Sequence, residues 1–158
     1  MEKKLKHEDY QRELERIIGQ KMNLTILRNK RYGLYIPDLT VTIGPRKGDK
    51  IVIDIAMDTR GILHALGGFY IIKILGYQIR LFIILVPDEK YEEIFSPFKM
   101  KGEKIVRRSG YRYIKRFLSL VRKEKIVIEP FSKISEIITS EMKKISQEII
   151  GLEPQKEG

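Results

Sequence analysis

Two acidic residues lie where the sequence otherwise predicts buried β-strands, and they limit the possible folds more than any other feature. Residues 36–44 and 50–58 are apolar and rich in β-branched side chains, yet Asp38 follows Pro37 in the first run and Asp54 lies between isoleucines in the second. A carboxylate inside a buried strand is costly unless it is paired, hydrogen-bonded or bound to a metal. The rest of the chain must therefore supply partners for both carboxyl groups.

The alternation of side chains within residues 51–58 predicts a strand with two different faces. The odd-numbered positions hold three isoleucines and Met57, which indicates a core face. The even-numbered positions include Asp54 and Asp58 with Ala56 between them, which indicates an acidic face. Such acids either cap loops and meet lysine or arginine, or they form a functional site.

Pro37-Asp38 at one strand and Asp54 inside the next apolar strand, followed by a helix and another strand, resemble the PD-(D/E)xK, or restriction-endonuclease-like, nuclease superfamily. This superfamily includes type II restriction enzymes and archaeal Holliday-junction resolvases. The resemblance covers residues 7–90 and implies the core order helix, three strands, helix, strand. It implies that Asp38 and Asp54 bind a divalent metal, Mg²⁺ or Mn²⁺. The chain departs from the family pattern two residues after Asp54, where Ala56 replaces the motif lysine.

The same resemblance suggests residues that complete the site. The first helix of the family often supplies a further glutamate, and Glu13 is nearest the apolar stripe of the helix predicted for residues 7–20. Some members carry the lysine on the helix after the acidic strand, where Lys73 lies. Arg60 is a second candidate, since its separation from Asp58 repeats the acid-x-base spacing. The alternatives are a solvent-facing Glu13 and a Lys73 that extends to solvent at the helix end.

A concentrated basic segment predicts a polyanionic partner. The chain has 31 lysines and arginines against 21 acids, and residues 97–125 alone hold eleven basic residues against two glutamates, a net charge of +9. Localised positive charge binds nucleic acid through release of counterions. The alternative is a solvated basic face that has only a general affinity for polyanions. We expect the partner to be DNA. The basic turn around Arg31 is either a further contact to DNA or an ordinary hairpin turn. The candidate nucleic-acid-binding residues are Arg31, Arg107, Arg108, Arg112, Lys115 and Arg116.

Hydrophobic periodicity predicts an α/β fold, a restriction-endonuclease-like mixed sheet of about four or five strands flanked by helices. Expected helices cover residues 7–20, 61–75, 91–95, 111–123 and a segment after Ser132. Expected strands cover residues 22–27, 36–44, 50–58, 77–86 and 126–128, and a loop is expected over residues 96–110. The isoleucine stripe of the last helix is a core face or, alternatively, the seam of a homodimer.

Residues 1–150 are expected to form one domain, with a core over residues 7–90, a basic extension over residues 97–150 and a disordered tail over residues 151–158. The absence of cysteine excludes disulfides, thiolate metal sites and a cysteine nucleophile. No apolar run is long enough for a membrane span, and the N-terminus lacks a signal-peptide pattern, so we expect a cytoplasmic protein without a membrane partner. Many Ile, Lys and Glu residues without Cys or Trp fit an archaeal or other thermophile.

Three functions are consistent with these features. The first is metal-dependent hydrolysis of DNA phosphodiester bonds, in which Asp38 and Asp54 hold Mg²⁺ and Lys73 or Arg60 takes the part of the missing lysine. The second is a catalytically inactive nuclease-like fold that binds nucleic acid or serves assembly, which Ala56 favours. The third is an unrelated α/β module whose acids are structural.

Overall fold

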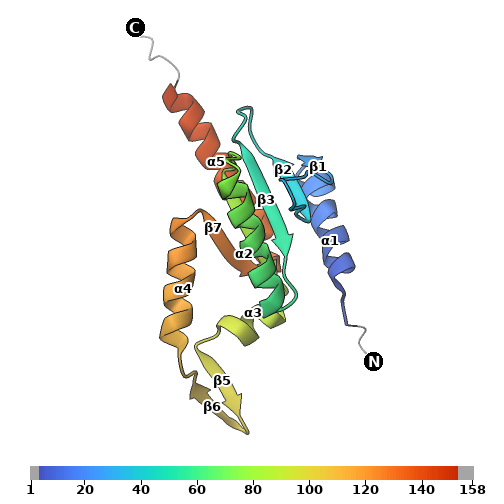
Figure 1. Ribbon diagram of the computed structural model, residues 1–158. Helices are drawn as coiled ribbons and strands as arrows, with labels where there is room; N and C mark the ends of the chain where they lie inside the picture. Colours follow the sequence, from blue (N-terminus) through green and yellow to red (C-terminus); the bar gives the residue numbers. More distant parts are fainter. Residues whose placement is uncertain (1–3, 153–158) are drawn as a thin grey trace.

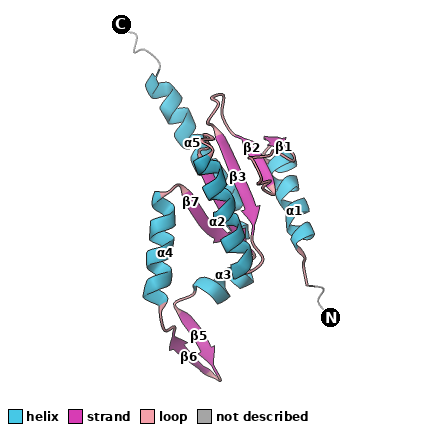
Figure 2. Ribbon diagram, in the orientation of Figure 1, coloured by secondary structure: helices cyan, strands magenta, loops and turns pink. Residues whose placement is uncertain are grey.

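A five-stranded mixed sheet lies at the centre of the computed structural model, which describes residues 4–152 (Figures 1 and 2). β1, β2 and β3 pair antiparallel, whereas β4 runs parallel to β3 and β7 runs parallel to β4. The fold is therefore α/β with a mixed sheet flanked by helices, as predicted. In sheet order, the strands are β1 (Thr25–Leu27), β2 (Leu39–Thr42), β3 (Lys50–Ile55), β4 (Leu81–Val86) and β7 (Ile126–Pro130).

The helices follow the predicted segments closely. α1 passes directly into a π-helix at Arg16–Lys21, and a 3₁₀ turn at Phe131–Lys133 precedes the last helix. That helix continues through Gly151 and Leu152, so the predicted tail is helical at these two positions, and residues 153–158 lie outside the described residues. Within residues 4–152, no helix combines the length and the apolarity needed to cross a membrane. The helices are α1 (His7–Glu15), α2 (Thr59–Ile74), α3 (Asp88–Phe95), α4 (Tyr111–Lys123) and α5 (Ile134–Leu152).

Both faces of the sheet are covered by helices, which corrects the expectation that β3 has one acidic, half-polar face. α1 and α5 pack on the face that carries Ile51 and Ile53, and α2 packs on the face that carries Val52 and Ala56. The two-residue alternation is present, but the even-numbered face is also a core. Asp54 is consequently buried, with only 7% of its surface exposed.

The isoleucine stripe of α5 belongs to the core. Ile134, Ile138 and Ile145 are buried against the strands on the α1 side of the sheet. This stripe is therefore not a free seam for a second copy of the chain.

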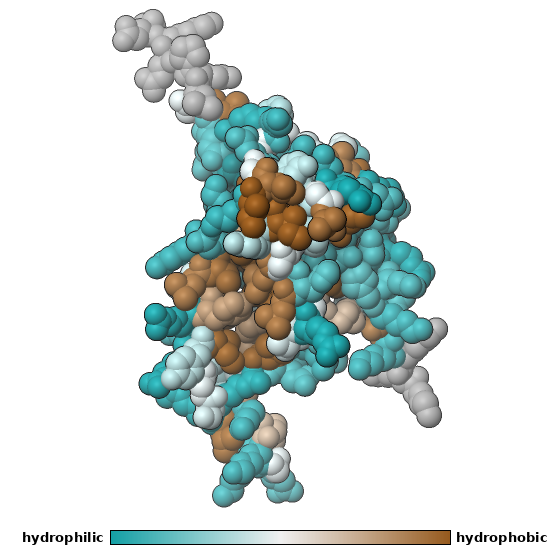
Figure 3. Space-filling view, in the orientation of Figure 1, coloured by the Kyte–Doolittle hydropathy of each residue, from teal (hydrophilic) through white to brown (hydrophobic). Residues whose placement is uncertain are grey.

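Helix α2 is apolar on all sides in sequence, a pattern that predicts a fully buried helix, but it is buried on one side only. Ile62, Ala65 and Ile72 face the sheet, whereas Leu63 and Tyr70 are exposed. Figure 3 shows this helix as part of a hydrophobic surface in the middle of the molecule.

The segment predicted as a loop over residues 96–110 contains a two-stranded antiparallel hairpin instead. Its strands are β5 (Phe98–Lys101) and β6 (Lys104–Arg107), and they form a sheet of their own. Gly102 in the turn has a φ of 66°, a conformation that glycine adopts without strain. Figure 1 shows the hairpin extending beyond α3, at the end of the molecule where α2 begins.

Of the two adjacent glycines in α2, one is required by packing. A glycine pair inside a helix indicates close approach of another backbone, but here the group that approaches is the Tyr35 ring, and it lies against Gly68 alone. A Cβ atom at Gly68 would overlap ring carbons of Tyr35, whereas a Cβ atom at Gly67 would meet nothing within 4 Å. Gly68 therefore holds Tyr35 beneath the helix.

We predict opposite effects on stability for these neighbours. Gly68→Ala should lower the free energy of unfolding by about 1–3 kcal/mol, because the buried ring must move. Gly67→Ala should raise it by about 0.5–1 kcal/mol through helix propensity alone. Urea denaturation of both variants is the measurement, and equal stabilities would contradict the packing of Tyr35 on Gly68.

Candidate functional site

The antiparallel pairing of β2 with β3 brings Asp38 and Asp54 together. Leu39 pairs with Ile53, so the residue before Leu39 lies opposite the residue after Ile53. The Asp38 backbone N–H donates to Asp54 Oδ1 at 3.1 Å, and the Ile55 backbone N–H donates to Asp38 Oδ2 at 2.8 Å. The two acids identified in the sequence therefore form one site at the carboxyl end of β3.

Two side chains from outside the strands complete the hydrogen bonds of this pair. The Tyr35 hydroxyl donates to Asp54 Oδ2 at 2.8 Å, and His7 Nε2 lies 2.9 Å from Asp38 Oδ2. Gln11, one turn after His7, donates to the Asp38 carbonyl at 3.3 Å. Helix α1 thus contributes two side chains to the site, and the turn before β2 contributes one.

Burial and like charge change the protonation of the pair. Burial, followed by the negative charge of Asp38, raises the pKa of Asp54 from 3.8 to about 7. Burial and the charge of Asp54 also raise the pKa of Tyr35 far above its usual value, so the phenol stays a neutral donor. Near neutral pH the two carboxyl groups therefore share less than two full negative charges.

A cavity of about 470 Å³ opens beside the carboxylates. Asp58 caps α2 by accepting a hydrogen bond from the Gly61 backbone N–H at 2.8 Å, and this first turn forms one wall. Arg60 is the one arginine or lysine among the described residues that line the cavity, and His64 lies one turn further along. The positive end of the helix dipole adds to the charge of Arg60 on this side.

The missing lysine has a steric explanation. Ala56 is buried directly beneath the start of α2, and a Cβ atom at Gly61 would lie 3.1 Å from Ala56 Cα. The helix start therefore occupies the space that a long side chain at position 56 would need. Arg60, on the same turn, is the cation closest in sequence to that position.

Two residues expected in the site lie elsewhere. Glu13 binds Arg16 on an exposed part of α1, because Leu14 and not Glu13 faces the core. Lys73 is exposed near the far end of α2, where its Nζ lies 2.7 Å from Glu124 Oε2. It is roughly 18 Å along the helix axis from Gly61, by the usual rise of about 1.5 Å per residue. The prediction that either residue joins Asp38 and Asp54 is wrong.

His7 is the site residue that was missed, although the sequence contains a signal for it. His7, Gln11 and Leu14 recur at spacings of four and three, so they share one face of α1. Because Leu14 is in the core, its face must point toward the sheet.

The predicted nucleic-acid-binding residues lie in three surroundings. Arg108 Nη1 donates to the Glu93 carbonyl at 2.7 Å and to the Ile94 carbonyl at 2.5 Å, so part of its guanidinium is engaged at the end of α3. Arg31 is exposed, but the neighbouring Tyr32 and Tyr35 are buried, so the turn interpretation is correct and base stacking by these tyrosines is excluded. The other predicted residues are all exposed: Arg107 on β6 and Arg112, Lys115 and Arg116 on α4.

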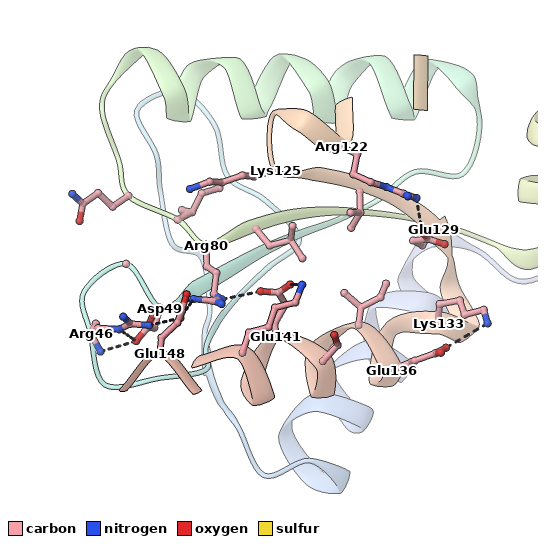
Figure 4. A pocket seen from close by; sticks show the side chains of 18 of the residues that line it. Arg46, Asp49, Arg80, Arg122, Lys125, Glu129, Lys133, Glu136, Glu141 and Glu148 are labelled. Carbon is pink, nitrogen blue, oxygen red and sulfur yellow. Dashed lines mark hydrogen bonds and ion pairs between the residues drawn. The ribbon is translucent and has the colours of Figure 1, made fainter. Parts of the chain in front are cut away.

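A second cavity, of about 1,100 Å³, lies at the amino end of β4 and is lined by charged side chains of both signs (Figure 4). Arg80 donates to Glu141 and Glu148 at 2.8 and 2.7 Å, and Arg46 bonds both Asp49 and Glu148. These bonds tie the β2–β3 turn to α5. Because the arginines there are matched by carboxylates, we assign this network to stability and not to ligand binding.

The donor atoms of the Asp38 and Asp54 pair suit a hard divalent cation. Within residues 4–152, no group of three or more His, Cys, Asp or Glu side chains is placed to hold a metal ion. Mg²⁺ is nevertheless commonly held by one or two carboxylates, with water and substrate phosphate completing its coordination. Burial and then repulsion by Asp38 raise the pKa of Asp54, and such a cation would relieve the repulsion.

Comparisons with protein-family models, curated proteins and solved structures found no match to this chain. The function is therefore inferred from the sequence and from the geometry of the site.

We predict that Asp54 makes stability fall as pH rises from about 4 to about 7, because its folded pKa exceeds its unfolded value and over this range the unfolded state has released a proton that the native state still binds. Asp54→Asn should remove this effect, so its unfolding free energy relative to wild type should rise over this range, by an amount on the order of a few kcal/mol. Urea denaturation at several pH values measures the difference. Glu8→Gln on the exposed side of α1 is the control, and a wild-type pH slope in Asp54→Asn would contradict the assignment.

We also predict that lysine is not tolerated at position 56. Ala56→Lys should lower the free energy of unfolding by at least about 2 kcal/mol, because the start of α2 must be displaced. Ala56→Ser, which adds a single oxygen, should cost less. A fully stable Ala56→Lys variant would show that α2 leaves room above position 56.

Proposed function

We propose that this protein is a metal-dependent nuclease that hydrolyses phosphodiester bonds in DNA. The observation that carries the proposal is the pairing of Asp38 with Asp54 beside a cavity at the carboxyl end of β3. The order helix, three strands, helix, strand around this pair supports the resemblance to PD-(D/E)xK nucleases.

Each residue of the site has a distinct part in this proposal. Asp38 and Asp54 would hold Mg²⁺ or Mn²⁺, and a bound ion of this kind supplies an activated water and neutralises charge on the phosphate. Tyr35 orients Asp54, and His7 orients Asp38. Arg60, at the cavity wall, stabilises the negative charge that develops at phosphorus, the part that the motif lysine plays in the resembled family.

The distribution of positive charge supports DNA as the substrate. The β5–β6 hairpin, α3 and the first turn of α2 lie at the same end of the molecule (Figure 1). A duplex held by the basic hairpin and by α4 would therefore lie toward the end of the sheet that carries the acidic pair. Contacts to phosphate provide affinity without selecting a base sequence. A cytoplasmic location fits this proposal.

A DNA-binding protein without nuclease activity is the second candidate function. The observation that favours it is the burial of Ala56 beneath Gly61, which excludes the family lysine from its usual position. In that case the paired acids stabilise the pairing of β2 with β3, and the basic surface alone binds DNA.

The test is cleavage of labelled linear and four-way-junction DNA with Mg²⁺ or Mn²⁺. Wild type should cut, Asp54→Asn should bind equally but cut at the background rate, and Arg60→Ala should cut on the order of a hundredfold more slowly. Glu13→Gln and Lys73→Ala are matched controls, because they remove the same charges outside the cavity, and both should cut like wild type. If wild type and Asp54→Asn bind alike and neither cuts, the DNA-binding function replaces the nuclease.

A further inference from the structure

The β5–β6 hairpin has two chemically different faces. Directly opposed residues of an antiparallel pair share a face, and Lys101 lies opposite Lys104 while Met100 lies opposite Ile105. The alternation along each strand therefore places the three lysines on one face and three of the four apolar side chains on the other. One face carries Lys99, Lys101, Lys104 and Val106, and the other carries Phe98, Met100, Ile105 and Arg107.

The lysine face lacks a counter-charge. Like charges directly opposite each other destabilise a hairpin, yet Lys101 and Lys104 occupy such positions. Within residues 4–152, neither these two lysines nor Lys99 has an ion-pair partner. An anionic partner outside the chain would offset this repulsion.

The apolar face lacks a cover. Phe98, Met100 and Ile105 are 56%, 63% and 71% exposed. A two-stranded hairpin has no core of its own, so these side chains do not serve the packing of the fold. In Figure 3, hydrophobic and hydrophilic residues lie side by side on the hairpin at the bottom of the view.

The base of the hairpin is fixed to the body of the protein. The Arg108 backbone N–H donates to the Pro97 carbonyl at 2.7 Å, which closes the hairpin at its base. The Arg108 guanidinium then binds the last carbonyls of α3, including that of Glu93. The hairpin therefore projects from the body of the protein with a fixed base, so the orientation of its two faces is defined.

We propose that the β5–β6 hairpin enters the major groove of duplex DNA. The lysine face contacts phosphates, and Phe98, Met100 and Ile105 contact base edges, including thymine methyl groups. This inference rests on the proposed function for DNA as the partner, and it specifies a duplex as the form of DNA bound.

The dimensions and charge of the hairpin fit this partner. A major groove about 12 Å wide and about 8.5 Å deep admits a two-stranded ribbon, and each four-residue strand spans roughly 13 Å. A single strand would require a row of aromatic side chains, but the hairpin has only Phe98. An anionic membrane is less well matched, because the hairpin lies at the same end as the acidic cavity proposed for a phosphodiester (Figure 1).

The experiment measures binding to a labelled duplex, to the corresponding single strand and to phosphatidylserine vesicles over a range of salt. Replacing Lys99, Lys101 and Lys104 with alanine should weaken duplex binding tenfold or more and reduce the slope of log K against log salt by about 3, or roughly 0.9 per lost phosphate contact. The matched control replaces Lys21, Lys47 and Lys143 with alanine. It removes the same charge away from the hairpin and should leave the slope near that of wild type.

The apolar face is tested separately. Met100→Ser with Ile105→Ser should weaken duplex binding on the order of tenfold with an unchanged salt slope, because no phosphate contact is lost. Wild type should bind a duplex containing uracil in place of thymine more weakly, and the serine variant should show a smaller difference between the two duplexes. Equal affinities of wild type and both hairpin variants for the duplex would overturn the proposal.

A loss of vesicle binding without a loss of duplex binding would overturn it in favour of a membrane surface. The two proposals also fail separately. Unchanged duplex binding by the hairpin variants, with cleavage abolished in Asp54→Asn, removes the hairpin proposal and keeps the nuclease. Reduced duplex binding by the hairpin variants, with no cleavage by wild type, keeps the hairpin proposal and removes the nuclease.

Discussion

The structure depends on two reciprocal hydrogen bonds between the start of β2 and the end of β3. The Asp38 backbone N–H donates to the Asp54 carboxylate, and the Ile55 backbone N–H donates to the Asp38 carboxylate. A buried carboxylate requires such partners, and the residues that supply them must in turn be accommodated by the surrounding core. Tyr35 must be buried to reach Asp54, and Gly68 must lack a side chain to accept Tyr35. The site and this part of the core therefore cannot be changed independently.

The two ends of the sheet differ in how their charges are compensated. At the amino end of β4, Arg80 and Arg46 are matched by carboxylates from α5 and from the β2–β3 turn. At the carboxyl end, Asp38 and Asp54 repel each other, and the hairpin beyond α3 carries lysines with no acidic partner in the described residues. Compensated charges stabilise a fold, whereas uncompensated charges cost stability and are commonly associated with binding. Both proposals therefore concern the carboxyl end.

The sequence was informative where a short pattern determined the local structure. The alternation around Asp54, the Pro37-Asp38 pair and the stripe of residues 111–123 predicted strand positions and a helix that the structure contains. The sequence was less informative where packing between elements determined which side chains are buried. Lys73 was a site candidate because it lies on the helix after the acidic strand, but it is exposed near the far end of α2. The alternation from Phe98 to Lys101 indicates a strand, but Pro97, Gly102 and the Arg107-Arg108 pair favoured a loop.

The raised pKa of Asp54 has a consequence for occupancy of the site. At a carboxyl group that keeps its proton to about pH 7, the proton competes with a cation, since it must leave before both oxygens can act as ligands. If the pair holds Mg²⁺ as proposed, its apparent affinity for the ion would fall about tenfold per pH unit below that value, as expected for release of one proton per ion bound. The Asp38 and Asp54 pair would then act as a proton–cation exchanger, loaded or emptied by modest changes in acidity around neutrality.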